Sequence, residues 1–187
     1  GSLLWEPWQA LKKDQTPYKV FTPYYRNGCL SAQVPREPLP KIDKGDFVSV
    51  EQGVDSIQRL NLLPTHAWHK ALAESWHISE QGAQAALGRF VTQGLLDYKA
   101  GRDFPAKAST STLAPYLHFG QLSVNQAWYA ARQAADSSDV EHFCSELVWR
   151  EFSYYLLYHF PTLPTENLNR KFNAFAWREG GEDLERW

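Results

Sequence analysis

The 187-residue sequence contains no methionine, only two cysteines and no long hydrophobic run. Two cysteines, Cys29 and Cys144, cannot build a disulfide framework or a four-thiolate zinc site, so we expect a reduced, cytoplasmic protein. Because no stretch of roughly 18 apolar residues occurs, we expect no transmembrane helix. The chain opens without the charged and then apolar leader of a secreted protein. The missing methionine, absent even from position 1, predicts a processed chain or a piece of a longer one.

Positive charge is also scarce. The 19 Lys and Arg residues are outnumbered by 21 Asp and Glu residues, which gives a formal net charge of −2 and a pI near 6.3. This balance excludes a protein that holds nucleic acid by bulk positive charge, although a local basic groove stays open. Hydrophobic residues at 43% and charged residues at 21% exclude a disordered chain. Aromatic residues are abundant at 14%, with eight tryptophans, which is more flat rings than an ordinary core needs.

Residues 1–54 are predicted to form an irregular, extended linker segment that leads into a helical domain over residues 55–187. Proline removes a backbone donor and restrains the residue before it. The segment contains Pro7, Pro17, Pro23, Pro35, Pro38 and Pro40. Its aromatic and aliphatic side chains are too many for a free tail, so we expect the segment to lie against a surface.

Helical patterns dominate from Asp55 onward, and no strand pattern of convincing length occurs, so the predicted fold class is mainly α. Ser79 is expected to cap a helix whose apolar positions follow an i, i+3, i+4, i+7 spacing. Ser123 with Gln126, and Ser138 with Glu141, form capping-box patterns at the start of two further helices. Residues 101–122 are predicted to be irregular. The predicted helices cover 55–63, 65–76, 79–100, 123–135, 138–159 and a last segment from 182 onward.

The helix predicted over 138–159 has two distinct faces. The apolar face consists of Val140, Phe143, Cys144, Leu147, Val148, Phe152, Tyr155 and Leu156. The second face carries Glu146, Trp149, Arg150 and Ser153 at the same helical spacing. This spacing fits a solvated face with a Glu146–Arg150 ion pair. The spacing also fits a strip that faces a ligand. In that case the Trp149 ring would stack on the ligand and the Arg150 guanidinium would bind an anionic group.

The run Ser109–Thr112 offers four consecutive hydroxyl groups beside backbone N–H groups. Such a run can form a turn or helix cap, which composition alone favours, or it can wrap a phosphate with neutral donors. The two common glycine-rich nucleotide loops are absent. The six histidines show no metal-ligand spacing, so we expect no metal site, and His118 is expected to be buried and hydrogen-bonded.

Three motifs follow one another along the chain. They are Tyr18–Tyr24 (YKVFTPY), Thr110–Ser123 (TSTLAPYLHFGQLS) and Glu146–Phe152 (ELVWREF). Tyr98 with Arg102–Pro105, and Trp177 followed ten residues later by Trp187, fit the same pattern. Together these motifs strongly resemble those of the DNA photolyase and cryptochrome family, in which the second motif is the flavin-binding signature. The resemblance runs from the first residues of the chain to the last.

The resemblance implies a helical, bundle-like FAD-binding domain of photolyase type. The implied enzyme is a deoxyribodipyrimidine photolyase-type carbon–carbon lyase that repairs cyclobutane pyrimidine dimers in DNA with light. In that family a damaged pyrimidine pair is flipped out of the duplex, and reduced, light-excited FAD donates one electron to it. The implied cofactor is therefore FAD, and the implied partner is damaged DNA. The sequence does not identify a second antenna chromophore.

Residue roles are implied by the resemblance, position by position. Flavin contacts fall on Tyr98, Thr110, Ser111, Thr112, Leu113, Ala114 and Arg150, with the hydroxyl and N–H groups of the loop directed at the phosphates. DNA contacts fall on Lys99, Glu146, Trp149 and Arg150. Glu146 would hydrogen-bond the lesion and Trp149 would stack on it. Trp177 stands where the family has the surface member of its electron-relay tryptophans, which completes the catalytic set Glu146, Trp149 and Trp177.

The sequence departs from the family pattern in two residues and in length. Thr112 stands where Arg is often found. Ala114 stands where Ser is usual, and the loss of one hydrogen bond is expected to cost about 1 kcal/mol of flavin binding. Measured against the family, we expect the N-terminal α/β antenna domain and the C-terminal half of the FAD-binding domain to lie outside this sequence. We therefore expect a fragment with an incomplete FAD pocket that is inactive in isolation and self-associates through an exposed, cut core.

Two alternative functions remain open at this stage. A cryptochrome-type blue-light photoreceptor would have the same FAD-binding domain with a signalling output. Glu146 together with Trp149 favours repair mildly, because a pure sensor needs no plate that stacks on a lesion. A non-enzymatic helical interaction module is the third class, although it leaves the ordered motifs as coincidence.

Overall fold

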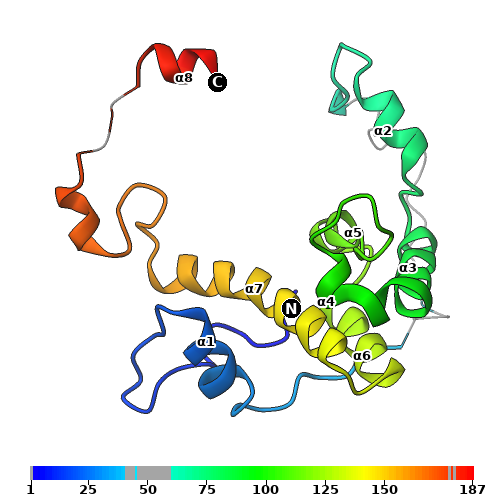
Figure 1. Ribbon diagram of the computed structural model, residues 1–187, viewed down its shortest axis with the longest axis horizontal. Coiled ribbons are helices and arrows are strands. Elements are labelled where there is room, and N and C mark those ends of the chain that lie inside the picture. Colours follow the sequence, from blue (N-terminus) through cyan, green and yellow to red (C-terminus); the bar gives the residue numbers. More distant parts are fainter. Residues whose placement is uncertain (1, 41–44, 46–59, 177, 179) are drawn as a thin grey trace. The chain divides into compact units, whose positions relative to one another are not determined.

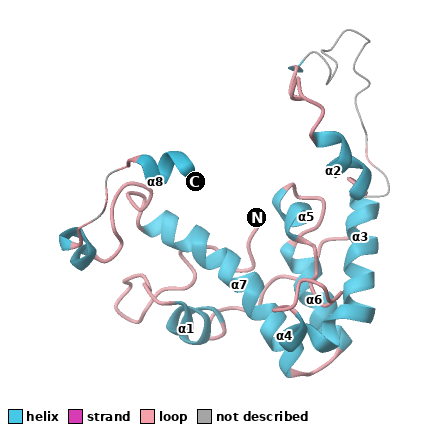
Figure 2. Cartoon of the chain, turned by 45° about the horizontal axis from the view of Figure 1, so that its top comes forward, coloured by secondary structure: helices cyan, strands magenta, loops and turns pink. Residues whose placement is uncertain are grey.

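The structure is a computed structural model that describes residues 2–40, 45, 60–176, 178 and 180–187 (Figure 1). Two compact units make up the chain. One comprises residues 1–4 and 34–148, and the other comprises residues 5–33 and 149–187. All regular elements in the described ranges are helical and none is a strand, which confirms the mainly α prediction (Figure 2). The predicted boundary between residues 54 and 55 lies outside the described residues.

Eight α-helices are present in the described parts of the chain. They are α1 (Phe21–Pro23), α2 (His69–Ser75), α3 (Glu80–Arg89), α4 (Tyr98–Gly101), α5 (Ala114–His118), α6 (Val124–Ala134), α7 (Ser138–His159) and α8 (Glu182–Arg186). Shorter segments are the π-helical η1 (Tyr24–Cys29) and η3 (Phe90–Gly94), and the 3₁₀-helical η4 (Leu95–Asp97) and η5 (Arg170–Ala174). The helix predicted over 79–100 is therefore one nearly continuous run of α3, η3, η4 and α4.

The core of the first unit is formed by α3, η3, α6 and the first half of α7, which Figures 1 and 2 both place together. The ring of Phe90 lies 4.7 Å from that of Phe143, and Tyr98 meets Phe143 edge-on at 5.3 Å. The apolar positions predicted for α7 from Val140 to Tyr155 are all buried, whereas the last predicted one, Leu156, is half-buried. Cys144 is fully buried among them, and burial raises the pKa of its thiol to about 12.

Two predicted helix caps are present as expected. The Ser79 hydroxyl accepts a hydrogen bond from the Gly82 backbone N–H at 2.9 Å. Ser123 and Gln126 form a reciprocal capping box at the start of α6. Each cap satisfies backbone N–H groups that the first turn of a helix leaves without a partner.

The predicted cap of α7 is off by one residue. Ser137, not Ser138, accepts a hydrogen bond from the Val140 backbone N–H (3.3 Å), and the Ser137 carbonyl accepts from the Glu141 N–H (3.0 Å). The sequence SSD offers two adjacent candidates, and packing of Val140 into the core selects the register that puts Ser137 outside the helix.

Three further expectations need correction. Residues 1–54 are not wholly irregular, because Phe21–Cys29 forms the short helical run of α1 and η1. Residues 101–122 contain the helix α5. The helix predicted over 65–76 is confined to α2, and within the helix predicted over 55–63 residues 55–59 lie outside the described residues while 61–63 form no helix.

The second unit packs the N-terminal segment onto the second half of α7. The Tyr155 hydroxyl donates to the Ala10 carbonyl at 2.9 Å and accepts from the Tyr18 N–H at 2.9 Å. The carboxylate of Glu151, which is buried, accepts from the Trp5 N–H at 3.2 Å. The surface that the segment was expected to need is therefore the far half of α7. No helix in the described part of the chain is long and apolar enough to cross a membrane.

Replacing the true cap of α7 should destabilise the chain. We expect Ser137→Ala to lower the free energy of unfolding by about 1 kcal/mol, the usual worth of an N-cap hydroxyl, because the Val140 N–H loses its acceptor. Ser138→Ala is the matched control and should change stability by only a few tenths of a kcal/mol. Urea unfolding followed by far-UV circular dichroism measures both, and equal effects from the two variants would contradict the cap assignment.

Candidate functional site

The hydroxyl loop, residues Ser109–Thr112, is tethered at its first residue. Ser109 is buried, and its hydroxyl donates to the Asp97 carboxylate at 3.0 Å. Thr110 and Thr112 are exposed and Ser111 is half-buried. Thr112 has a φ of 53°, a left-handed conformation that a β-branched residue adopts rarely. The loop is thus pinned at Ser109. Within it, the Thr112 hydroxyl donates to the Ser111 carbonyl at 2.7 Å, and the Ser111 hydroxyl accepts from the Leu113 N–H at 3.4 Å.

A cavity of about 310 Å³ lies beside this loop. Thr110, Ser111 and Thr112 line one side of it, and Arg89, Gln93 and Lys107 contribute the other polar groups. A second cavity, also of about 310 Å³, lies beside Trp76, His77 and Tyr116 and shares Ala86, Arg89 and Thr112 with the first. Two cationic side chains and the hydroxyls of Thr110 and Ser111 around one hollow form a donor set suited to an anion such as a phosphate, while the Thr112 hydroxyl already donates within the loop.

Arg89 and Lys107 were not among the predicted cofactor contacts. Arg89 ends α3, well before the loop in the sequence, so only the packing of α3 brings it to Thr112. The Lys107 ammonium lies 3.8 Å from the Asp97 carboxylate, which also accepts from Ser109. The sequence signal that could have found Arg89 is its position as the basic residue of the last turn of α3.

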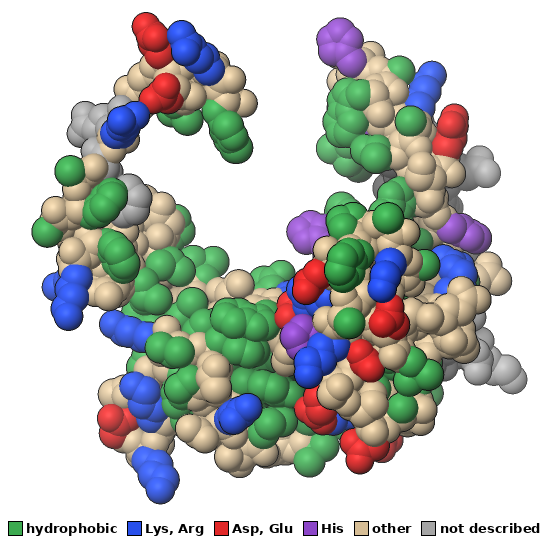
Figure 3. Space-filling model, viewed as in Figure 1, with side chains coloured by type: hydrophobic (Ala, Val, Ile, Leu, Met, Phe, Trp, Pro, Cys, Tyr) green, Lys and Arg blue, Asp and Glu red, His purple; other side chains and the backbone are tan. Residues whose placement is uncertain are grey.

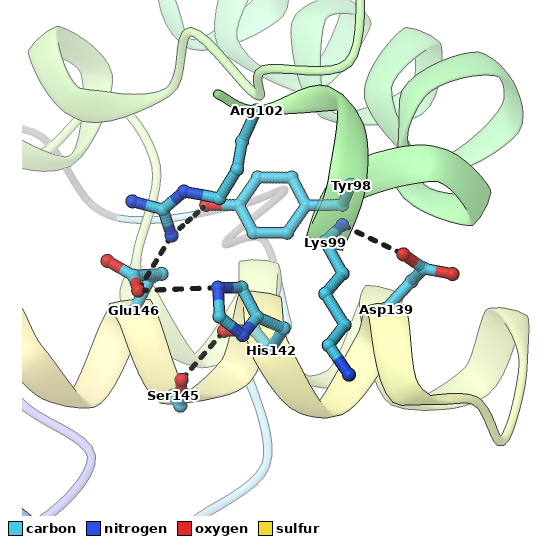
Figure 4. Close-up of polar contacts among 7 residues, drawn as sticks. All are labelled: Tyr98, Lys99, Arg102, Asp139, His142, Ser145 and Glu146. Atoms are coloured by element: carbon cyan, nitrogen blue, oxygen red, sulfur yellow. Dashed lines mark hydrogen bonds and ion pairs between the residues drawn. The ribbon is translucent and has the colours of Figure 1, made fainter. Parts of the chain in front are cut away.

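Glu146 takes part in a polar cluster with residues of α4 and α7 (Figure 4). Its Oε1 atom lies 2.6 Å from the Arg102 guanidinium and 3.8 Å from Nε2 of His142. The hydrogen bond to Glu146 raises the pKa of Arg102, and burial raises the pKa of Tyr98, whose hydroxyl lies 3.5 Å from the same guanidinium. Both ion-pair contacts among the described residues use Oε1, so Oε2 is left to accept a hydrogen bond from a ligand.

The ion-pair contacts of Glu146 among the described residues are with Arg102 and His142, and the predicted pairing with Arg150 is not one of them. The carboxylate is fixed by Arg102, a residue of the Tyr98…Arg102 motif whose partner the sequence did not reveal. The Arg150 guanidinium lies over the ring of Tyr154, 5.1 Å from its centroid. The Lys99 backbone N–H donates to Asp139 at 2.8 Å, while its side chain extends away from the cluster (Figure 4).

Trp149 lies against Phe21 of α1 in the second unit. The two rings are stacked with centroids 3.7 Å apart and an angle of 11° between their planes. The side chain of Trp149 is nevertheless 46% exposed. Phe21 therefore supports the indole ring of Trp149 by stacking on it. The sequence analysis did not identify Phe21 in this role.

The remaining predicted site residues occupy varied environments. Leu113 is buried and anchors the start of α5, whereas Ala114 is exposed. His118 was expected to be buried, but it is exposed, because the apolar side of the short helix α5 is formed by Tyr116 and Leu117. Trp177 lies outside the described residues. The residues described contain no group of three or more His, Cys, Asp or Glu side chains that could hold a metal ion.

The predicted residues divide between the two units. The loop, Tyr98, Lys99 and Glu146 belong to the first unit, and Trp149 and Arg150 belong to the second. Glu146 and Trp149 are three residues apart on the single helix α7, so they follow each other by less than one turn. That the loop and Trp149 serve one pocket stays a prediction.

Comparison with known proteins identifies the class of this fold. A family model described as the FAD binding domain of DNA photolyase matches residues 143–187. A solved structure of a bacterial class III photolyase from Agrobacterium tumefaciens superposes with a TM-score of 0.87 at 36% identity, covering 100% of this chain and 39% of that one. The fold is that of the helical FAD-binding domain of photolyases.

Curated relatives define the family. The deoxyribodipyrimidine photo-lyase of Agrobacterium fabrum is 37% identical over 193 residues, and cryptochrome-2 of Arabidopsis thaliana is 26% identical over 207 residues. Both alignments cover 100% of this chain, but only 40% and 33% of the respective relatives. The chain belongs to the DNA photolyase and cryptochrome family and spans about two fifths or less of the length of these relatives.

The tether of the hydroxyl loop depends on the absence of a side chain at Gly101. A Cβ atom there would lie 2.1 Å from the Ser109 hydroxyl and 2.5 Å from the Asp97 carboxylate. We expect Gly101→Ala to lower the free energy of unfolding by about 1–3 kcal/mol, the usual cost of overpacking, and to displace the loop.

Gly88→Ala is the matched control for this prediction. A Cβ at exposed Gly88 in α3 meets nothing within 4 Å, so the change should raise the free energy of unfolding by about 0.5–1 kcal/mol through helix propensity alone. Thermal and urea unfolding measure both variants. A Gly101→Ala variant as stable as Gly88→Ala would contradict the tight packing at the tether.

Proposed function

We propose that this chain forms part of the FAD pocket and of the DNA-contacting face of a light-driven deoxyribodipyrimidine photo-lyase. The observation that carries the proposal is the cavity of about 310 Å³ that Thr110, Ser111 and Thr112 line together with Arg89 and Lys107. This donor set fits the diphosphate of FAD, which needs cationic and neutral donors around a dianion. Thr110, Ser111, Thr112 and Arg89 would hold the phosphates. When bound, FAD would supply light-driven transfer of one electron to the cyclobutane ring of the lesion.

On the DNA side, each side chain of the proposed site has a separate task. Trp149 would stack on a flipped pyrimidine of the dimer, since an aromatic plate receives any base face. Glu146, held by Arg102 through Oε1, would accept a hydrogen bond from the lesion at Oε2. Lys99 and Arg150 would contact the DNA backbone near the lesion. Extruding a damaged pair costs less than extruding an intact one, because the damaged pair stacks poorly.

A cryptochrome-type photoreceptor is the second candidate. The match to cryptochrome-2 over 100% of this chain supports it, because a shared FAD-binding fold does not distinguish repair from signalling. The exposed, supported ring of Trp149 and the oriented Glu146 carboxylate favour repair, since a sensor has no use for a surface that receives a flipped base.

Illumination of damaged DNA separates the two candidates. We expect the native gene product that carries this sequence to repair DNA that contains cyclobutane dimers under blue light. Gel electrophoresis measures the loss of the dimers. Trp149→Ala should weaken affinity for dimer-containing DNA by about ten- to a hundredfold, the worth of one stacked base. A gene product that binds FAD but repairs nothing would favour the photoreceptor.

The phosphate assignment is tested by FAD binding. We expect the isolated chain to bind FAD weakly or not at all. In the native gene product, we expect Arg89→Ala to weaken FAD binding by about tenfold or more, because a charge-assisted hydrogen bond to phosphate is lost. Arg26→Ala, an exposed arginine of the other unit, is the matched control and should leave the affinity unchanged. Absorbance of retained flavin after desalting measures both, and equal retention by Arg89→Ala would contradict the assignment.

A further inference from the structure

Phe21 lies flat beneath Trp149 and makes that ring a supported plate. The two centroids are 3.7 Å apart and the planes differ by 11°. The rings of Phe152 and Trp149 lie 5.9 Å apart, with an angle of 74° between their planes. No other ring contacts Trp149 among the described residues. Phe21 thus covers one face of the indole, while Trp149 as a whole stays 46% exposed.

The support is itself held in place by buried aromatic residues. Tyr25, one turn further along the same helical run, stacks on Phe21 at 5.8 Å and 24°, and Phe152 meets Phe21 edge-on at 5.8 Å. Tyr25 and Phe152 are both buried, at 8% and 6% exposure. Phe21 therefore packs on two buried rings, those of Tyr25 and Phe152, rather than on a mobile surface side chain.

The position of Phe21 along α7 is set by hydrogen bonds. The Tyr18 backbone N–H donates to the Tyr155 hydroxyl at 2.9 Å, three residues before Phe21. Tyr155, Phe152 and Trp149 follow one another at intervals of three residues on α7, so they lie along one side of the helix. Fixing Tyr18 at Tyr155 therefore brings Phe21 to Phe152 and Trp149.

Simple core packing does not account for this arrangement. Trp149 is 46% exposed, whereas Phe21 is half-buried and Tyr25 and Phe152 are buried. A tryptophan that served only to fill the core would be covered on both faces. The indole of Trp149 is already held by Phe21 on one face. It therefore loses little rotational freedom when a base stacks on its other face.

We propose that Phe21 is a positioning residue for base recognition: by stacking beneath Trp149, it holds the open face of the indole ready to receive an extruded pyrimidine. This inference rests on the proposed function, in which Trp149 binds the lesion. Phe21 touches no substrate and acts only through Trp149. Nothing in the sequence pattern alone distinguishes it from the neighbouring aromatic residues of the Tyr18–Tyr25 stretch.

Binding of oligonucleotides with and without one cyclobutane dimer tests the inference in the native gene product. We expect Phe21→Leu to weaken affinity for dimer DNA by about three- to tenfold, the range of an aromatic pair, with affinity for undamaged DNA unchanged. Phe21→Tyr should restore wild-type affinity. In a Trp149→Ala background, Phe21→Leu should have no further effect, because the plate that it supports is gone.

A spectroscopic measurement separates positioning from folding. In protein labelled with 5-fluorotryptophan, the ¹⁹F resonance of Trp149 is the one lost in Trp149→Phe. We expect the Trp149 resonance to shift in Phe21→Leu and to have its wild-type chemical shift in Phe21→Tyr. The other indole resonances should stay in place in both variants. Phe160→Leu, the same exchange at the end of α7 where Phe160 lies under Lys19, is the matched control and should move neither the resonance nor the affinity.

The outcomes distinguish the two levels of the argument. If Trp149→Ala itself leaves dimer affinity unchanged, the proposed function fails. If Trp149→Ala weakens dimer binding but Phe21→Leu does not, or if Phe21→Leu acts equally on undamaged DNA or equally in the Trp149→Ala background, the positioning role is overturned and the proposed function stands.

Discussion

Burial along one side of α7 is the constraint on which the rest of the structure depends. Side chains from Val140 to Tyr155 are buried at helical spacing, the first part in one unit and the remainder in the other. Hydrophobic gain from these side chains fixes the rotation of the helix, so the side that carries Glu146 and Trp149 stays partly exposed. Figure 3 shows hydrophobic side chains gathered where Figure 1 draws α1 and the second half of α7.

Each candidate functional group is held by a neighbour from a distant part of the sequence. Arg102 of the α4 end fixes one oxygen of Glu146, Asp97 fixes Ser109 at the start of the hydroxyl loop, and Phe21 lies under Trp149. A ligand that meets groups already fixed loses less conformational entropy on binding than one that must order them. The supporting residues therefore contribute to the site as much as the groups that would touch FAD or DNA.

Much of the fold was predictable because it depends on local chemistry. The cap at Ser79, the capping box at Ser123–Gln126 and the apolar side of α7 all follow from spacing within single helices. The cap of α7 was misplaced by one residue, since Ser137 and Ser138 are equivalent locally and only the burial of Val140 decides between them. The short helices α1 and α5 were missed because they are too short to show a period and are stabilised by packing.

The sequence by itself determined the helical class, the family resemblance and the identities of the loop and α7 residues, because motifs and helical periods are written in consecutive residues. Only the tertiary structure decided that Arg89 lines the hydroxyl-loop cavity, that Glu146 is paired with Arg102, and that Phe21 supports Trp149. These contacts join residues far apart in the chain, and no local spacing encodes them. Their partners are selected by the burial of side chains between elements, which is a property of the folded chain.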